Sequence, residues 1–250
     1  IEIMTKRFCR QIGFGKPLLF WGFSLAFGLS RRTSMCSALS SHMLSLLYNQ
    51  YYFIFAILPI LLFFCGSVME DDPIIFVFRY ESYKHYFTAK WRSLGVLCSG
   101  LWLGQITILF VTGAGLSVIK QGWDNFSGSS LLKEIAPLLV KSFPGAWVAV
   151  FCAAVYMLMG YWLIALLTLW LGHFLQRKKA IKVLLALYIL TILSIKLPIM
   201  SRPPFCYLTG INHWVLLLHN LTAGWRFPLT VIVTLLFVVT VICSIQGGWR

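Results

Sequence analysis

The chain has 250 residues, of which 59% are hydrophobic and only 11% are charged, and its mean hydropathy is +0.83. Soluble domains carry roughly 25% charged residues, so this composition excludes a water-soluble surface and predicts an integral membrane protein. The 21 Lys and Arg residues outnumber the 7 Asp and Glu residues. Because the cations lie mostly between apolar runs, they indicate membrane topology and contact with anionic lipid, not a nucleic-acid partner.

The N-terminal segment, residues 4–16, combines apolar and basic side chains. Phe8 and Ile12 share one helical face, whereas Arg7 and Arg10 lie on another. This pattern predicts a short helix lying in the membrane interface. A solvated basic tail is the alternative interpretation.

The apolar runs that follow predict a single all-α membrane domain over residues 1–250. A bilayer core about 30 Å thick needs about 20 apolar residues of helix. The sequence predicts six spans, at residues 17–30, 51–69, 94–119, 145–175, 183–200 and 228–245. The first run is the shortest, and it can instead continue past Arg31 and Arg32. Residues 33–69 contain no Lys, Arg, Asp or Glu, which leaves room for a further span.

Charge and turn residues orient these spans. With both termini in the cytoplasm, most cations lie on the inner side, including the dense cluster Arg177, Lys178 and Lys179. The positive-inside rule therefore predicts a multi-pass protein of the cell membrane with cytoplasmic termini. The apolar segment 205–225 is interrupted by Gly210 and Gly224, so it is predicted to form a re-entrant hairpin on the outer side.

Residues 73–91, between the second and third predicted spans, form an amphipathic pattern. Asp72 and Pro73 are helix-start signals. The aromatic residues Tyr83, Phe87 and Trp91 then recur every fourth position, which gathers them on one helical face. Two interpretations are open. The helix either seats its aromatic side chains among lipid headgroups or docks into a cytoplasmic partner.

The order of these elements resembles the permease subunit of type-2 ABC exporters. Glu70 resembles the leading acidic residue of the family's cytoplasmic segment, and Ser82, Tyr83 and Lys84 resemble its polar and basic cluster. Tyr86 and Lys90 resemble the aromatic residue and the closing lysine. The stretch 79–92 is also similar to the loop of short Gram-positive peptide and antibiotic export permeases. A Gly-Thr-Leu-Glu-like element that often follows the leading acid is replaced here by residues 71–75.

The resemblance implies a transport subunit without an ATP site of its own. A separate ABC ATPase would bind ATP and Mg, and a second permease chain, identical or homologous, would complete the pathway. The exported substrate would be amphipathic, such as a peptide, an antibiotic or a lipid-like compound. The ATPase would dock on the cytoplasmic coupling helix, at Arg79, Tyr80, Glu81, Ser82, Tyr83, Lys84, Tyr86, Phe87, Lys90 and Trp91.

Polar residues inside predicted spans are candidates for lining a pathway. They are Gln105, Thr107, Thr112, Tyr156 and Thr168. Such residues also hydrogen-bond between helices, which is the alternative interpretation. No Asp or Glu lies within a predicted span, which argues against a proton-coupled transporter.

The chain shows no pattern typical of catalysis or metal binding. Its five His and seven Cys residues are scattered without metal-ligand spacing, so no metal site, resident cofactor or catalytic residue is expected. The alternative to a transport subunit is a non-transport membrane subunit that anchors or regulates a complex.

Overall fold

The computed structural model describes residues 2–32, 38–69, 83–117, 137, 139–196 and 236–243. These residues form an all-helical structure, as predicted. The helices are α1 Glu2–Ile12, α2 Gly15–Arg32, α3 Leu39–Leu47, α4 Gln50–Tyr52, the π-helix η1 Phe53–Ile57, α5 Leu58–Gly66, α7 Tyr83–Thr112, α9 Ala146–Phe174 and α10 Arg177–Lys196. A further short helix covers residues 236–243.

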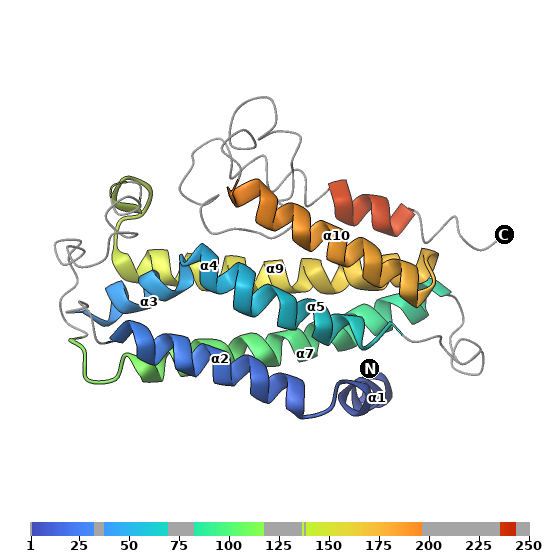
Figure 1. Ribbon diagram of the computed structural model, residues 1–250, viewed down its shortest axis with the longest axis horizontal. Coiled ribbons are helices and arrows are strands. Elements are labelled where there is room, and N and C mark those ends of the chain that lie inside the picture. The colour runs from blue at the N-terminus through green and yellow to red at the C-terminus, as the bar shows by residue number, and fades with distance from the viewer. Residues whose placement is uncertain are drawn as a thin grey trace.

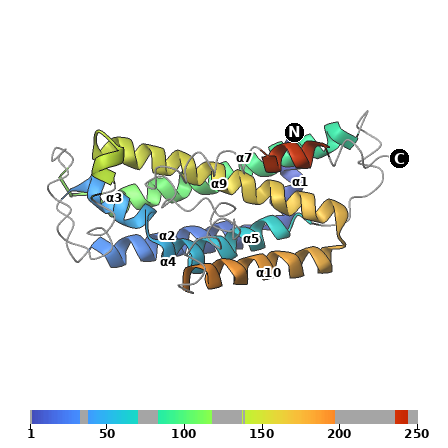
Figure 2. The same cartoon turned by 90° about the horizontal axis from the view of Figure 1, so that it is seen from above.

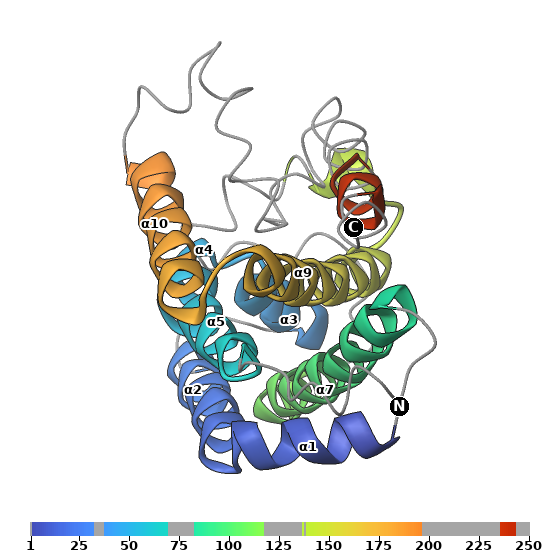
Figure 3. The same ribbon diagram turned by 90° about the vertical axis from the view of Figure 1, so that its right-hand side faces the viewer.

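The helices form an elongated bundle in which successive segments run in alternating directions (Figure 1). Helix α2, the segment from α3 to α5, α7, α9 and α10 each follow the long axis. Helix α1 lies across one end of the bundle, against the start of α7 (Figure 3). We call this end, which also holds the start of α10, the α1 end, and the opposite end the α3 end.

Two described helices are long and apolar enough to cross a membrane, α7 and α9. At about 1.5 Å per residue, each exceeds the thickness of a bilayer core. Helices α1 and α2 pass as a third candidate if the pair, bent by 69°, is counted as one span; the apolar stretch Phe53–Gly66 is shorter. The structure therefore supports membrane association, while the six-span topology stays a prediction.

Helix α7 corrects the predicted boundary between the coupling helix and the third span. Residues 83–91 are the first turns of the same continuous helix that ends at Thr112. The sequence from Tyr83 to Thr112 contains no proline, so nothing interrupts its backbone hydrogen bonds. The predicted separate helix 73–91 is therefore wrong in its second half, and its first half lies outside the described residues.

The other boundaries agree to different degrees. Helix α9 matches the predicted span 145–175 closely, and α10 begins earlier than predicted, within the basic cluster at Arg177. The span predicted at 51–69 consists of α4, η1 and α5. The hairpin at 205–225 lies outside the described residues, as do residues 197–200 and most of 228–245.

Gly13 separates the first two helices. Its φ of +69° lies in the left-handed region, and its N–H donates to the carbonyl oxygen of Cys9 at 3.0 Å. This is a glycine cap that ends a helix. The predicted interfacial helix 4–16 therefore ends at Ile12, and its apolar face, with Met4 and Phe8 buried, packs against α7.

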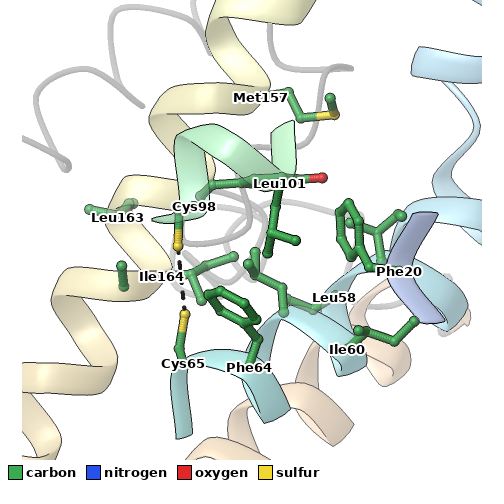
Figure 4. Packing of buried hydrophobic residues seen from close by; sticks show 14 of the residues in the cluster. Phe20, Leu58, Ile60, Phe64, Cys65, Cys98, Leu101, Met157, Leu163 and Ile164 are labelled. Carbon is green, nitrogen blue, oxygen red and sulfur yellow. Dashed lines mark hydrogen bonds between the residues drawn. The ribbon is translucent and has the colours of Figure 1, made fainter. Parts of the chain in front are cut away.

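The core lies around α9, the most deeply buried of the long helices. Helices α3, α5, α7 and α10 all pack against it, and Figure 2 shows α7 and α9 lying side by side. Between α5, α7 and α9, the buried side chains include Phe64, Leu101 and Ile164 (Figure 4). The thiols of Cys65 and Cys98 also meet here, with their sulfur atoms 4.0 Å apart.

Helices α2 and α7 approach closely through glycines. A Cβ atom added to Gly28 would lie 2.6 Å from Oγ1 of Thr112, and one added to Gly104 would lie 2.4 Å from Nε1 of Trp21. Small residues at such crossings allow backbones to approach, a common basis of helix association in membranes. Trp21 uses this proximity to donate from Nε1 to the carbonyl oxygen of Leu101 at 3.2 Å.

We expect Gly28→Ala to destabilise the bundle by about 1–3 kcal/mol, the usual cost of overpacking, because Thr112 blocks the new methyl group. Gly22→Ala on the same helix is the matched control, since nothing lies within 4 Å of its added Cβ. Thermal unfolding of the detergent-solubilised chain measures both. Equal melting temperatures for the two variants would contradict the close approach of α2 and α7.

Candidate functional site

Four buried polar side chains form a continuous series of hydrogen bonds across the bundle, which we call the central polar chain (Tyr161, Gln105, Tyr52 and Ser24). The Tyr161 hydroxyl donates to Oε1 of Gln105 at 2.5 Å. Nε2 of Gln105 donates to the Tyr52 hydroxyl at 3.2 Å. That hydroxyl donates to Oγ of Ser24 at 2.8 Å, and Ser24 donates to the carbonyl oxygen of Phe20 at 2.9 Å.

The central polar chain connects α9, α7, α4 and α2 in that order. Tyr161, Gln105 and Ser24 have no exposed surface, and Tyr52 is 7% exposed. Aromatic packing fixes both tyrosines: the Tyr52 ring stacks on Phe27 with centroids 4.0 Å apart, and Phe20 meets the Tyr161 ring edge-on. Because no water can replace a lost partner at this depth, the four side chains hold their helices in one relative register.

The π-helix η1 begins directly after Tyr52. A π-helical turn contains one residue more than the α-helical turn it replaces, and such turns occur often at functional sites. Tyr52, which bonds to Gln105, is the residue directly before this turn. Pro59 lies two residues after η1, inside a helical stretch that is unbroken from residue 50 to residue 66. Because proline has no N–H group and its ring crowds the preceding turn, it disfavours a regular α-helix at this point.

A second polar cluster lies at the α3 end. Nε2 of His42 and Oγ1 of Thr112 are hydrogen-bonded at 3.2 Å, and His42 is fully buried. Its Nδ1 atom has no hydrogen-bond partner. Nearby, the Arg32 guanidinium donates to the carbonyl oxygen of Ala114 at 2.6 Å, which ties the last turn of α2 to the turn after α7.

The surroundings of His42 disfavour its charged form. Helix α3 lies outside the helices long enough to cross a membrane. Burial lowers the pKa of His42, and the positive charge of Arg32 lowers it further. His42 is therefore a neutral imidazole at pH 7 in the folded protein.

A third cluster lies at the α1 end, where α7 begins and α9 ends. The Tyr83 hydroxyl is hydrogen-bonded to Nδ1 of His173, and the two rings lie 4.7 Å apart. Lys90 is only 8% exposed, and its Nζ lies 5.6 Å from the centroid of the Tyr86 ring. The contact between Tyr83 and His173 joins the first turn of α7 to the last turn of α9.

The structure divides the predicted docking residues into two groups. Tyr86, Phe87 and Lys90 are buried within the chain, whereas Lys84 is exposed and Tyr83 and Trp91 are half-buried. The aromatic face of this segment therefore packs inside the bundle. Arg79, Tyr80, Glu81 and Ser82 lie outside the described residues, and the docking role of all ten residues stays a prediction.

The predicted pathway residues do not lie together. Gln105 belongs to the central polar chain, whereas Thr112 binds His42 at the α3 end. Thr107 is exposed and donates to the carbonyl oxygen of Leu103 in its own helix. Thr168 is buried and likewise donates within its own helix, to Ile164. Tyr156 is buried on α9.

Sequence reasoning missed most of the central polar chain. Ser24, Tyr52 and Tyr161 lie in apolar runs where a hydroxyl is easily taken for an isolated side chain. The sequence feature that could have revealed them is a polar atom within an apolar run, because such an atom needs a hydrogen-bond partner on another helix. His42, which the sequence gives no reason to pair with any residue, is buried between α3 and α7.

The chemistry of these clusters is that of hydrogen bonding and packing. Within the described part of the chain, no group of three or more His, Cys, Asp or Glu side chains could hold a metal ion. The tyrosine, amide and serine groups of the central polar chain are weak acids and bases. They can break and re-form hydrogen bonds when helices move relative to one another.

Comparison with known proteins adds no relative: no protein-family model, no curated protein and no solved structure matches this chain.

Replacing Gln105 with Leu should destabilise the protein, because the Tyr161 and Tyr52 hydroxyls both lose a partner. An unsatisfied buried group costs about 1–3 kcal/mol, although hydrogen bonds within membranes average nearer 0.6 kcal/mol. Thr107→Val on the same helix is the control, because this exposed hydroxyl bonds only to its own helix. A double-mutant cycle with Tyr161→Phe, followed by thermal unfolding, isolates the coupling between Gln105 and Tyr161. Strictly additive effects would disprove this hydrogen bond.

The lowered pKa of His42 predicts that stability falls in acid. The unfolded state takes up a proton near pH 6.5 while the folded state resists it, so the free energy of unfolding decreases as the pH drops below that value. Melting temperatures measured between about pH 7.5 and pH 5, a range that spans the ordinary histidine pKa, should fall less for His42→Gln than for the wild-type chain. Parallel pH profiles would show that His42 is not responsible.

Proposed function

We propose that this chain is the membrane permease subunit of an ABC-type exporter, driven by a separate ATPase that carries ATP and Mg. The observation that supports this most directly is the continuity of α7. One unbroken helix runs from the predicted docking segment at Tyr83 to Thr112. A partner that displaces its first turns would move the whole helix, because an α-helix is stiff along its axis.

Contacts at the α1 end would pass this displacement to neighbouring helices. Tyr83 is bonded to His173 at the last turn of α9, and α1 packs on α7 through Phe8. Farther along α7, Gln105 holds the Tyr161 and Tyr52 hydroxyls. A shift of α7 would therefore strain the central polar chain, which has few alternative partners. The hydrogen bonds of the central polar chain would then either stay intact or break together. A rearrangement of this kind suits a transporter that alternates between two states.

The distribution of charge supports a cytoplasmic position for the α1 end. Most of the described cations lie there, namely Lys6, Arg7, Arg10, Lys16, Lys84, Lys90, Arg92, Arg177, Lys178, Lys179 and Lys182. The α3 end holds Arg31, Arg32 and Lys141. By the positive-inside rule, the α1 end would face the cytoplasm, on the side where an ATPase has access to ATP.

Within this proposal, the ATPase would contact the exposed side of the segment. Lys84 and His85 are exposed, whereas Tyr86 and Phe87 face the bundle. Lys84 and His85, together with the residues that precede Tyr83, would bind the partner. The buried aromatic residues would anchor the segment to the permease. This assignment differs from aromatic docking, in which Phe87 itself would enter the partner.

The proposed transporter also needs a second permease chain, identical or homologous, to enclose a path. Large apolar side chains remain exposed along α7 and α9, including Leu103, Phe110 and Phe151, and they are available for lipid or for that second chain. The exported substrate would be amphipathic, such as a peptide, an antibiotic or a lipid-like compound.

One observation favours a second candidate, a non-transport subunit that anchors or regulates a membrane complex. Gln105, Thr112 and Thr168, which were candidates for lining a pathway, all use their polar groups in contacts within the bundle. A subunit that only holds a complex in the membrane would need no more than this.

Placing negative charge at the exposed residues Lys84 and His85 tests the proposal. We expect Lys84→Glu with His85→Glu to reduce the amount of a P-loop ATPase that co-purifies with the tagged full chain by at least about tenfold, equivalent to about 1.4 kcal/mol. Substrate-stimulated ATP hydrolysis should fall in parallel. Membrane insertion should be unchanged, because both side chains are exposed.

Gln176→Glu with Lys178→Glu is the matched control, since it makes the same change in formal charge at two exposed residues at the same end of the bundle. Equal losses in both variants would indicate a general charge effect. Co-purification of a complex without an ATPase would favour the anchoring subunit instead.

A further inference from the structure

A groove lies between α5 and α10, on the outer surface of the bundle. The two helices run side by side in two perpendicular views (Figures 1 and 2). One face of α5, from Pro59 to Ser67, and one face of α10, from Arg177 to Tyr188, line a volume of about 240 Å³. This is below the range of sites that enclose drug-sized ligands, so it suits one extended chain better than a whole molecule.

The groove is apolar along its length and polar at one end. Phe63, Ile181 and Leu185 form its walls and are strongly exposed, while Leu184 is buried. Gly66 contributes no side chain, and nothing lies within 4 Å of where its Cβ would be. Because α5 and α10 run in opposite directions, Ser67 and Arg177 meet at the same end, which is the α1 end.

Cations concentrate at this polar end. Arg177 lines the groove itself. Lys16, at the start of α2, places its Nζ 4.9 Å from the centroid of the Phe63 ring. No described Asp or Glu lines the groove. The groove therefore fits a ligand whose apolar chain packs against its walls and whose anionic headgroup lies beside its cations.

We propose that this groove binds an anionic phospholipid, with one acyl chain between α5 and α10 and its phosphate beside Arg177 and Lys16. The bilayer supplies such a lipid at the depth where the apolar walls lie, and basic pockets between membrane helices are typical sites for anionic headgroups. The proposal does not depend on an ATPase or on transport, because it uses neither the docking segment nor the central polar chain.

Photocrosslinking of the purified full chain tests this proposal. The chain is placed in nanodiscs of phosphatidylcholine that contain a minor fraction of phosphatidylglycerol with a photoreactive group in its acyl chain. After irradiation, labelled peptides are identified by mass spectrometry. We expect adducts to concentrate on residues 58–67 and 177–188, and to be about fivefold weaker with a photoreactive phosphatidylcholine, since one basic residue near a membrane surface contributes about that factor.

Two variants separate the headgroup site from the acyl site. Arg177→Gln should reduce labelling by phosphatidylglycerol about fivefold, while Lys178→Gln, which removes the same charge outside the groove, should not. Gly66→Leu should block the groove and reduce labelling by either lipid, and it meets no neighbouring atom at its Cβ. Adding inorganic phosphate should leave labelling unchanged, which distinguishes a lipid from a free phosphate.

Three outcomes would overturn the proposal. Equal labelling by phosphatidylglycerol and phosphatidylcholine would show that the groove is an ordinary lipid-facing surface without headgroup selectivity. Labelling spread evenly over the exposed faces of α7 and α9 would do the same. If a photoreactive amino acid placed at Leu185 crosslinked two copies of the chain, a second copy would cover the groove instead of a lipid.

Discussion

A polar group buried away from water must find its partner inside the protein, and this constraint determines how the bundle is assembled. Gln105 is the clearest case, because its amide carries both a donor and an acceptor and has no exposed surface. Tyr161 satisfies one and Tyr52 the other. Since these tyrosines belong to different helices, satisfying one side chain fixes three elements at once, and Ser24 extends the effect to a fourth.

The same constraint explains the tryptophans at the contact between α7 and α9. The indole of Trp102 donates to the carbonyl oxygen of Ala154 at 2.9 Å, and that of Trp162 donates to Oγ of Ser99 at 3.0 Å. Each indole thus brings a large apolar area to the contact and satisfies its single donor across the helix pair. The two longest helices behave as a unit, which gives the proposed displacement of α7 a defined effect on α9.

How far the sequence predicts this structure depends on the kind of signal. Helix α9 was predicted to within a residue or so at each end, because its apolar run is long and ends at a basic cluster. The predicted end of one helix at Trp91 and start of another at Leu94 is wrong, because α7 is continuous there. Hydropathy changes at this point, but the backbone hydrogen bonds of the helix continue. The partners of Gln105 could not be predicted, since Tyr161 and Tyr52 are more than fifty positions away. The burial of Tyr86 and Phe87 likewise depends on packing between distant segments.

The π-helix η1 fixes the rotational position of Tyr52 relative to α5. If the extra residue of Phe53–Ile57 were absorbed and this stretch became regular α-helix, everything before it would turn by about 100° and slide by about 1.5 Å relative to α5. Tyr52 would then swing away from Gln105 and Ser24, while Leu58 and Phe64 kept their places in the core. The one extra residue of η1 therefore determines whether Tyr52 can connect Ser24 of α2 with Gln105 of α7.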